Sequence, residues 1–212
     1  MSSLLTMPRS RSVLEMPAGA VMPSLGVGVD SKSIEARLRS IRQLLTEPVS
    51  NIANVRDTDL TGATLPEQLR SKALSLKRIA GAVAMHLTKD WRLKLFARID
   101  ELCSPEDWDE PCDLPSEQSF STFLRMIIYL HPTRRPGIGL SNRGHFVAAW
   151  TRGSDRIVIE CIGNDEVRWV LSKITDGERE SGAGKVSLHR IPDVIAGYEP
   201  EELFNDAHRL LA

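Results

Sequence analysis

The chain has 212 residues and a formal net charge of −1, with 42% hydrophobic and 26% charged residues. These proportions are ordinary for a globular protein, and they exclude an overall electrostatic attraction to nucleic acid or to a membrane surface. The sequence contains no apolar run of about 20 residues, the length that a membrane-spanning helix needs, so no membrane partner is expected.

The amino-terminal segment 1–30 mixes Met, Pro, Gly and Ser without periodicity and lacks the layout of a signal peptide. It is predicted to be a disordered or loosely ordered tail, and an alternative is a segment that folds on a partner. The three cysteines, Cys103, Cys112 and Cys161, form no C-x-x-C motif, which is typical of free thiols in a reducing compartment. A cytoplasmic protein of bacterial type is therefore expected.

Residues 31–212 are predicted to form a single α+β domain, and its first part, 31–131, contains about four helices. The first helix is expected to begin at Asp30 or Ser31, because apolar residues recur there at helical spacing. Pro48 ends this helix, and a polar connector follows it.

Each of the next three helices has a recognisable start signal. Thr64 can cap a helix that has a proline in its first turn and continues through the apolar stretch 78–87. Asp90 is expected to cap the third helix and Ser116 the fourth. The apolar stripe of the third helix is expected to consist of Leu93, Phe96, Ile99 and Leu102.

From residue 137 the hydrophobic period changes from 3.6 to 2, which predicts an antiparallel β-meander over 137–191. Hairpin tips at 153–154 and at 163–165 fix one register for the three central strands. This register predicts the opposing pairs Trp150/Ile157, Ala148/Ile159, Phe146/Cys161, Cys161/Val167, Ile159/Trp169 and Ile157/Leu171.

In this register one face of the sheet is wholly apolar. It consists of Phe146, Ala148, Trp150, Ile157, Ile159, Cys161, Val167, Trp169 and Leu171. A sheet with one apolar face needs a second layer, which the second to fourth helices can supply. The fold class is therefore predicted to be α+β, with the helices packed on the face that carries Trp150 and Trp169.

The opposite face is mixed. It carries Val147, Ala149, Thr151, Arg156, Val158, Glu160, Arg168 and Val170. Glu160 is expected opposite Arg168, a pair of charges that stabilises a sheet by about 0.2–1 kcal/mol. The valine-rich part is too apolar for a plain solvent-facing surface, so either another part of the chain or another protein covers it. The predicted partner-binding residues are Val147, Val158, Val170 and Arg156.

The carboxyl-terminal region is less regular. Residues 175–185 are polar and rich in glycine, which predicts a loop, and 185–191 is a candidate for a fifth strand. The GAGK motif at 182–185 lacks the spacing and the Ser or Thr of a phosphate-binding loop. A carboxyl-terminal helix is predicted over 200–211, with acidic residues in its first turn and Arg209 in its last.

Charge is unevenly distributed along the helical part. Residues 65–99 carry eight basic and two acidic residues, whereas residues 100–117 carry eight acidic residues and no basic ones. A basic helix pair can contact phosphates, but the acidic segment is expected to neutralise it, and no aromatic residues are interleaved with the cations. Nucleic acid is therefore not the expected partner.

The junction 131–145 contains a second basic cluster. It consists of Arg134, Arg135, Arg143 and His145. Guanidinium groups bind carboxylates and phosphates through paired hydrogen bonds, so this cluster is the predicted anion-binding site. The alternative is a charged junction loop without a ligand.

The sequence offers no credible catalytic constellation. In the predicted register Cys161 lies on the apolar face and His145 on the other, so the two cannot form a nucleophile and base pair. The histidines are dispersed, one to an element, and the acidic residues in 106–113 lack the spacing of a calcium-binding loop. No catalytic residue, metal or cofactor is predicted.

The favoured hypothesis is a non-enzymatic interaction protein, of an accessory, regulatory, antitoxin or immunity type, that binds another protein. The first alternative is a small-ligand-binding protein or enzyme that uses the Arg134, Arg135, Arg143 and His145 cluster on an anionic substrate. A lesser alternative is nucleic-acid binding through the basic helices 65–99. No oligomeric state is predicted.

Overall fold

The computed structural model describes residues 39–40, 43, 63–108 and 112–205. The predicted tail over 1–30 lies outside them. Most of the first predicted helix also lies outside them, and its described residues are helical.

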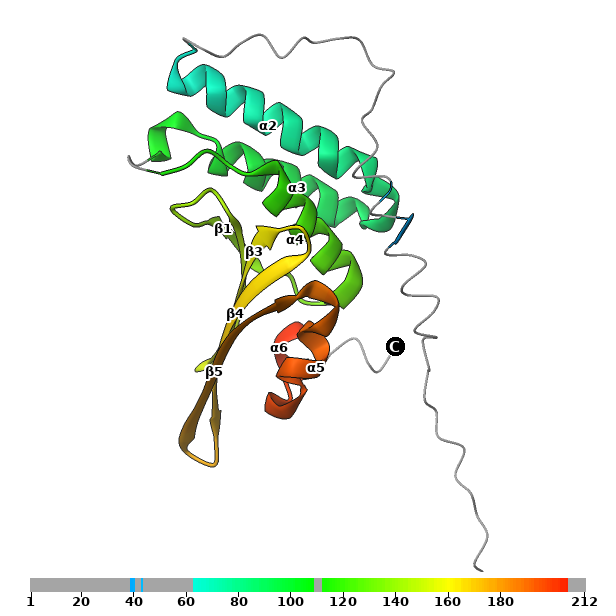
Figure 1. The fold of residues 1–212 in the computed structure, drawn as a ribbon, viewed down its shortest axis with the longest axis vertical. Coiled ribbons are helices and arrows are strands. Elements are labelled where there is room, and N and C mark those ends of the chain that lie inside the picture. Colours follow the sequence, from blue (N-terminus) through cyan, green and yellow to red (C-terminus); the bar gives the residue numbers. More distant parts are fainter. Residues whose placement is uncertain (1–38, 41–42, 44–62, 109–111, 206–212) are drawn as a thin grey trace, which may run out of the picture.

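Between residues 63 and 130 the described chain forms three α-helices. In Figure 1 α2 and α3 lie above the sheet, and α4 runs down beside its upper part. Their bounds are α2 (Leu65–Ala82), α3 (Lys89–Leu102) and α4 (Glu117–Leu130). Short 3-10 turns follow the first two helices, η1 (Ala84–His86) and η2 (Pro105–Asp107).

Two of the predicted helix starts are confirmed. At the start of α2 the backbone N–H of Thr64 donates to Glu67 Oε2 at 2.8 Å, which completes a capping box. At the start of α4 the hydroxyl of Ser116 accepts a hydrogen bond from the backbone N–H of Ser119 at 3.3 Å.

The helix α3 differs from the prediction in its cap and in its buried face. Its cap is Thr88, and Asp90 already belongs to the first turn, where a carboxylate suits the helix dipole. Leu95 and Ile99 are each 1% exposed, whereas Leu93 is 61% exposed. The buried stripe therefore follows the four-residue step from Leu95 to Ile99, and the inclusion of Leu93 was wrong.

The helix α2 ends at Ala82, although the apolar stretch 78–87 predicted a longer helix. Gly81 lowers helix stability at this point, and the chain then turns through Val83 into η1. Val83 and Leu87 are nevertheless buried, so the apolar stretch contributes to the core without being one continuous helix.

Five antiparallel strands form one sheet in the order β1-β2-β3-β4-β5. Their bounds are β1 (Gly137–Leu140), β2 (Phe146–Arg152), β3 (Asp155–Gly163), β4 (Glu166–Thr175) and β5 (Glu178–Ser187). Every pair of opposing residues that the sequence predicted is present, including Trp150 opposite Ile157 and Ile159 opposite Trp169. The predicted register is therefore confirmed. A slip of one residue would have moved the buried apolar residues of these strands to the other face of the sheet.

Strand β5 corrects the prediction of a loop over 175–185. After a turn at 176–177, residues 178–187 pair with β4, with Gly184 opposite Trp169 and Gly182 opposite Leu171. The two strands form a long hairpin that extends below the helices in Figure 1. The GAGK motif is therefore part of a strand.

The α+β fold class is confirmed, but two groups of elements share the apolar face of the sheet. The helix α4 packs on β2 and β3, and α2 and α3 contact α4 or the β1 edge. The rest of the face is covered by the segment that follows β5, which lies on the same side of the sheet as α4 (Figure 1). This segment contains η3 (Leu188–Arg190), α5 (Ile191–Ile195), η4 (Ala196–Tyr198) and α6 (Glu201–Phe204).

The two tryptophans of the apolar face contact this carboxyl-terminal segment. Trp150 meets Phe204 edge to face, with ring centroids 4.9 Å apart, and Trp169 meets Tyr198 with centroids 6.2 Å apart. Both tryptophans are buried on the same face, as the sequence predicted. The sequence predicted the helical layer on this face, and the structure adds that the carboxyl-terminal segment supplies the aromatic contacts to both tryptophans.

The carboxyl-terminal helix is confirmed, but it is shorter than the predicted 200–211. It ends at Phe204, because Asn205 has an extended backbone and the carbonyl of Phe204 accepts a hydrogen bond from the N–H of Arg134 at 2.9 Å. The remainder of the predicted helix lies outside the described residues.

Polar contacts fasten α4 to the sheet. The buried hydroxyl of Ser119 accepts a hydrogen bond from the N–H of Phe146 at 2.7 Å and donates one to the carbonyl of Cys161. Further along, Arg125 forms a largely buried ion pair with Asp165, in the turn between β3 and β4. These contacts join α4 to β2, to β3 and to the turn between β3 and β4.

Candidate binding surface and groove

The outer face of the sheet, opposite the core, carries a row of small apolar residues that crosses all five strands. Strand pairing places the following residues side by side in this central row: Gly137, Ala149, Val158, Val170 and Ala183. Val170 is 50% exposed, and Ile174, further along β4, is 40% exposed. The predicted partner-binding residues Val147, Val158, Val170 and Arg156 therefore share one surface.

Charged residues border the central row on one side. Glu160 accepts a hydrogen bond from Arg168 at 3.0 Å and lies 2.9 Å from Nδ1 of His145. Burial raises the pKa of Glu160, but hydrogen bonds from His145 and Ser141 and the charge of Arg168 outweigh this effect, so the pKa is lowered. The predicted pairing of Glu160 with Arg168 is confirmed.

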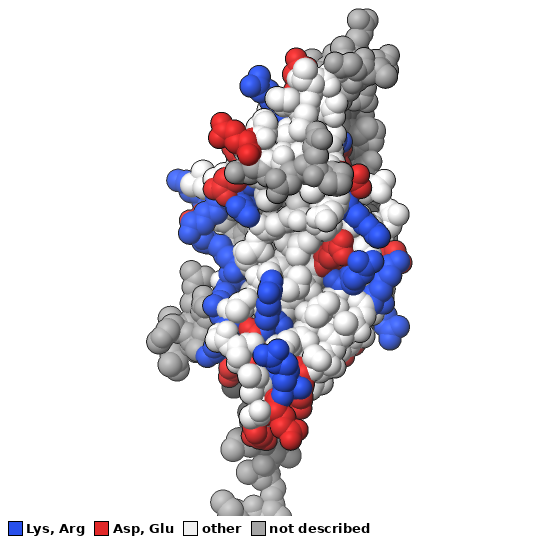
Figure 2. Space-filling view, turned by 90° about the vertical axis from the view of Figure 1, so that its left-hand side faces the viewer, with Lys and Arg blue, Asp and Glu red and all other residues white. Residues whose placement is uncertain are grey.

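On the other side of the central row stands Arg156. It pairs with Thr151 on β2 and with Ser172 on β4 and is exposed. Within the described chain Arg156 forms no ion pair. Figure 2 shows this side of the molecule, where Lys and Arg side chains surround and interrupt a broad uncharged area.

A groove of about 730 Å³ lies between α3 and the β1 end of this outer face. Its lining residues are Trp91, Lys94, Leu95, Arg98, Arg135, Pro136, Gly137, Ile138, Gly139, Leu140, Val147, Ala149 and Arg156. The groove is not predicted by the sequence, because its helical wall and its strand floor are far apart in the chain. The signal was present in the basic residues of α3 and in the two glycines of β1.

The side chain of Arg98 holds α3 along the free edge of β1. Its Nε donates to the backbone carbonyl of Ile138 at 2.8 Å, and Nη1 pairs with Glu101 at 2.7 Å. An otherwise unpaired carbonyl of the edge strand is thereby satisfied. The same contact joins the helical wall of the groove to its strand floor.

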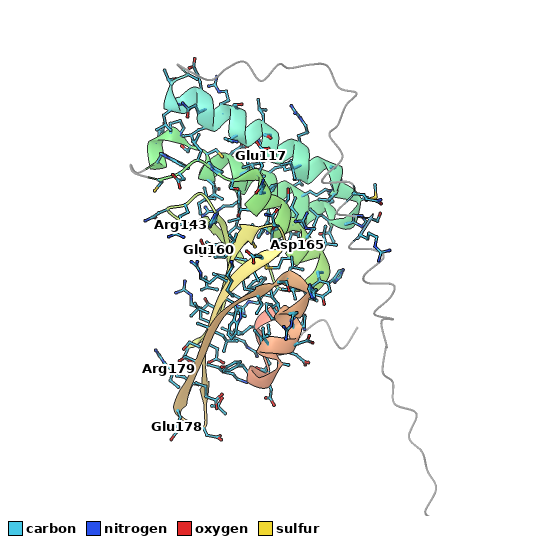
Figure 3. The ribbon with its side chains drawn as sticks, viewed as in Figure 1. Glu117, Arg143, Glu160, Asp165, Glu178 and Arg179 are labelled. Atoms are coloured by element: carbon cyan, nitrogen blue, oxygen red, sulfur yellow. The ribbon has the colours of Figure 1, made fainter. Side chains whose placement is uncertain are left out.

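The structure separates the residues of the predicted anion-binding cluster. Arg135 lines the groove and pairs with Asp90, whereas the carbonyl of Arg134 accepts a hydrogen bond from Trp150 Nε1 at 2.9 Å. Arg143 lies at the opposite end of β1, in the turn to β2, and Figure 3 places its side chain at the outer edge of the fold. His145 is engaged with Glu160.

Acidic residues at the two ends of the segment 100–117, on α3 and α4, pair with the basic helices. Lys72 contacts Glu117 at 3.1 Å and Lys77 contacts Asp100 at 2.5 Å, in addition to the pair formed by Arg98. Part of the positive charge of residues 65–99 is thus neutralised within the fold, which weakens the nucleic-acid hypothesis.

The buried thiols have the surroundings of core residues. Cys161 is fully buried, lies 3.9 Å from Met126 Sδ, and has a pKa raised by its burial. Burial, with a smaller contribution from the nearby charge of Asp100, raises the pKa of Cys103 to about 11. Both effects suppress the reactive thiolate form at neutral pH.

In the described ranges no group of three or more His, Cys, Asp or Glu side chains is placed to hold a metal ion. No helix in this part of the chain is long and apolar enough to cross a membrane. Comparison with protein-family models, with curated proteins and with solved structures finds no match for this chain.

Proposed function

We propose that this chain is a cytoplasmic interaction protein that binds another protein through the outer face of its sheet. The observation that carries the proposal is the central row, in which apolar side chains remain accessible between charged borders. Val170 is half exposed, so the described residues leave its part of the row uncovered. Exposed apolar patches with polar rims are typical of protein-binding surfaces.

The shape of the row favours a protein partner over a compact ligand. The side chains are small and belong to neighbouring strands of a single sheet, so they form a broad and shallow surface. The cations at its borders, Arg156 and Arg168, favour a partner surface that carries carboxylates around an apolar centre.

The test begins with affinity capture by the full chain, followed by purification of the captured protein and a direct titration. We expect Val170→Glu to weaken binding at least tenfold, because a carboxylate would enter an apolar contact. Leu74→Glu is the matched control, because Leu74 is an exposed leucine on α2, away from the sheet, with 61% exposure. The proposal fails if no purified partner binds, or if Val170→Glu binds that partner as tightly as the unmodified chain.

A further inference from the structure

The groove beside α3 has a volume and a lining that suit a small molecule. Its volume of about 730 Å³ lies within the range of roughly 300–1,000 Å³ that is usual for small-ligand sites. Val147, Ala149 and the two glycines of β1 contribute small floor residues, while Trp91 and Leu95 contribute a larger apolar wall from α3.

Gly139 leaves open space above the floor of the groove, and the packing around it would also allow a larger residue at this position. A Cβ placed on Gly139 would meet no heavy atom within 4 Å. Glycine weakens a strand, and in a strand it often marks the close approach of a ligand or of another backbone. Here the open space faces the groove, because Gly139 pairs with Val147, which lines it.

The charged side chains that line the groove are all positive. Four cations line it, Lys94, Arg98, Arg135 and Arg156, and no carboxylate is among its described lining residues. Arg98 and Arg135 already have acidic partners. In the described chain Lys94 and Arg156 have none, so two cations remain to receive an anionic group.

We propose that this groove binds a small organic anion, a carboxylate with a compact apolar body. The body lies over Gly139 and Ala149 against Trp91, and the carboxylate accepts charge-assisted hydrogen bonds from Lys94 and Arg156. This inference goes beyond the proposed protein-binding function. Arg156 borders both sites, but the groove lies at the β1 end of the outer face, whereas Val170, which tests protein binding, lies on β4 and does not line the groove.

The direct test titrates the full chain with 1-naphthoate and, separately, with 1-naphthylmethylammonium, which has the same ring system and the opposite charge. We expect saturable binding of 1-naphthoate, weakened by added salt, and at least tenfold weaker binding of the cation. Amide NMR shifts are expected in α3, β1 and β2. No saturable binding of 1-naphthoate, or equal binding of the two probes, would overturn the proposal.

Gly139→Val separates binding from folding. The new side chain enters open space and has high strand propensity, so thermal stability is expected to stay unchanged or to rise, while 1-naphthoate binding falls at least tenfold. Gly81→Ala is the matched control, because a Cβ at Gly81 also meets no heavy atom within 4 Å and this glycine does not line the groove. A folded Gly139→Val variant that binds 1-naphthoate as tightly as the unmodified chain would overturn the proposal.

The charge requirement is tested separately. Lys94→Gln and Arg156→Gln are each expected to weaken 1-naphthoate binding about tenfold. Arg179→Gln, at the far tip of the β4–β5 hairpin in Figure 3, is expected to leave it unchanged. Val170→Glu should also retain 1-naphthoate binding, which distinguishes failure of the groove from failure of the protein-binding face. Equal affinities for Lys94→Gln, Arg156→Gln and Arg179→Gln would contradict the assigned roles.

Discussion

Gly182 lies directly against the side chain of Tyr198. A Cβ placed on this glycine would be 2.3 Å from the hydroxyl oxygen of Tyr198 and 3.1 Å from the ring of Trp169. Gly184, two residues along the same face of β5, lies equally close to Trp169. The rings of Trp169 and Tyr198 therefore fill the space that side chains of β5 would otherwise occupy.

Gly182→Ala is expected to destabilise the fold, because the added methyl group requires Tyr198 to move. Overpacking of this kind typically costs about 1–3 kcal/mol. Urea denaturation gives the free energy of unfolding. Gly139→Ala, a strand glycine with open space around its Cβ position, is the control and should show no loss. A Gly182→Ala variant as stable as that control would contradict the packing described for β5.

The ion pair between Arg125 and Asp165 predicts strong thermodynamic coupling. Their side chains are 9% and 17% exposed, and Figure 3 shows Asp165 on the side of the sheet that faces α4. Removal of one partner of a buried pair costs about 3–5 kcal/mol, because the other charge stays buried and unpaired. Asp165→Asn retains a residue that tolerates the left-handed backbone at this turn.

A double-mutant cycle with Asp165→Asn and Arg125→Met measures this coupling. Each single substitution is expected to lower the free energy of unfolding, and the double variant should be more stable than the sum of the two losses implies. Strictly additive losses would mean that the pair has no energetic role.

Glu160 predicts part of the pH dependence of stability. Its pKa is lowered in the fold, so its contribution is present above the unfolded value of about 4.3 and is lost as the pH falls through the folded value. Glu160→Gln should therefore be less stable than the unmodified chain near pH 6, and the difference should shrink toward pH 3. Parallel stability curves for the two proteins over this range would contradict the assignment.

The cysteines should react with a thiol reagent in the order of their exposure. Cys112 is partly exposed, whereas Cys103 and Cys161 are 5% and 0% exposed. At neutral pH the folded chain should show one fast labelling phase, and Cys112→Ser should remove it. Denaturant should make all three sites reactive. A fast phase that persists in Cys112→Ser would show that a core thiol is accessible.

The central register was predictable because two independent features agree there. The turn at 153–154 fixes the pairing of β2 with β3, and alternation of apolar residues fixes which side is buried. The helix starts at Thr64 and Ser116 were predictable for a similar reason, since a capping residue and the first apolar turn coincide.

Strand β5 was not predictable from its composition. Its core-facing positions include Gly182 and Gly184, and its outward positions are polar or small, so no apolar alternation is visible. The apolar volume is supplied by Trp169 and Tyr198, which belong to other segments. The hydrophobic periodicity of a segment does not reveal apolar side chains that other segments contribute to the same space.

The candidate sites were predictable only in part. Val147, Val158 and Val170 follow from the register, and the structure places them on one surface. The basic cluster at the junction was grouped by closeness in the sequence, but β1 separates Arg135 from Arg143. The groove unites Lys94 with Arg156, a tertiary relationship that sequence spacing does not contain.

The contacts of Trp150 with Phe204 and of Trp169 with Tyr198 have a consequence for the order of folding. Tyr198 and Phe204 follow all five strands in the chain, so an intermediate in which the sheet forms before the carboxyl-terminal segment docks carries two uncovered indole rings. Transiently exposed apolar surface is what chaperones bind and what drives aggregation. Slow docking of residues 188–204 on the sheet would prolong this vulnerable state.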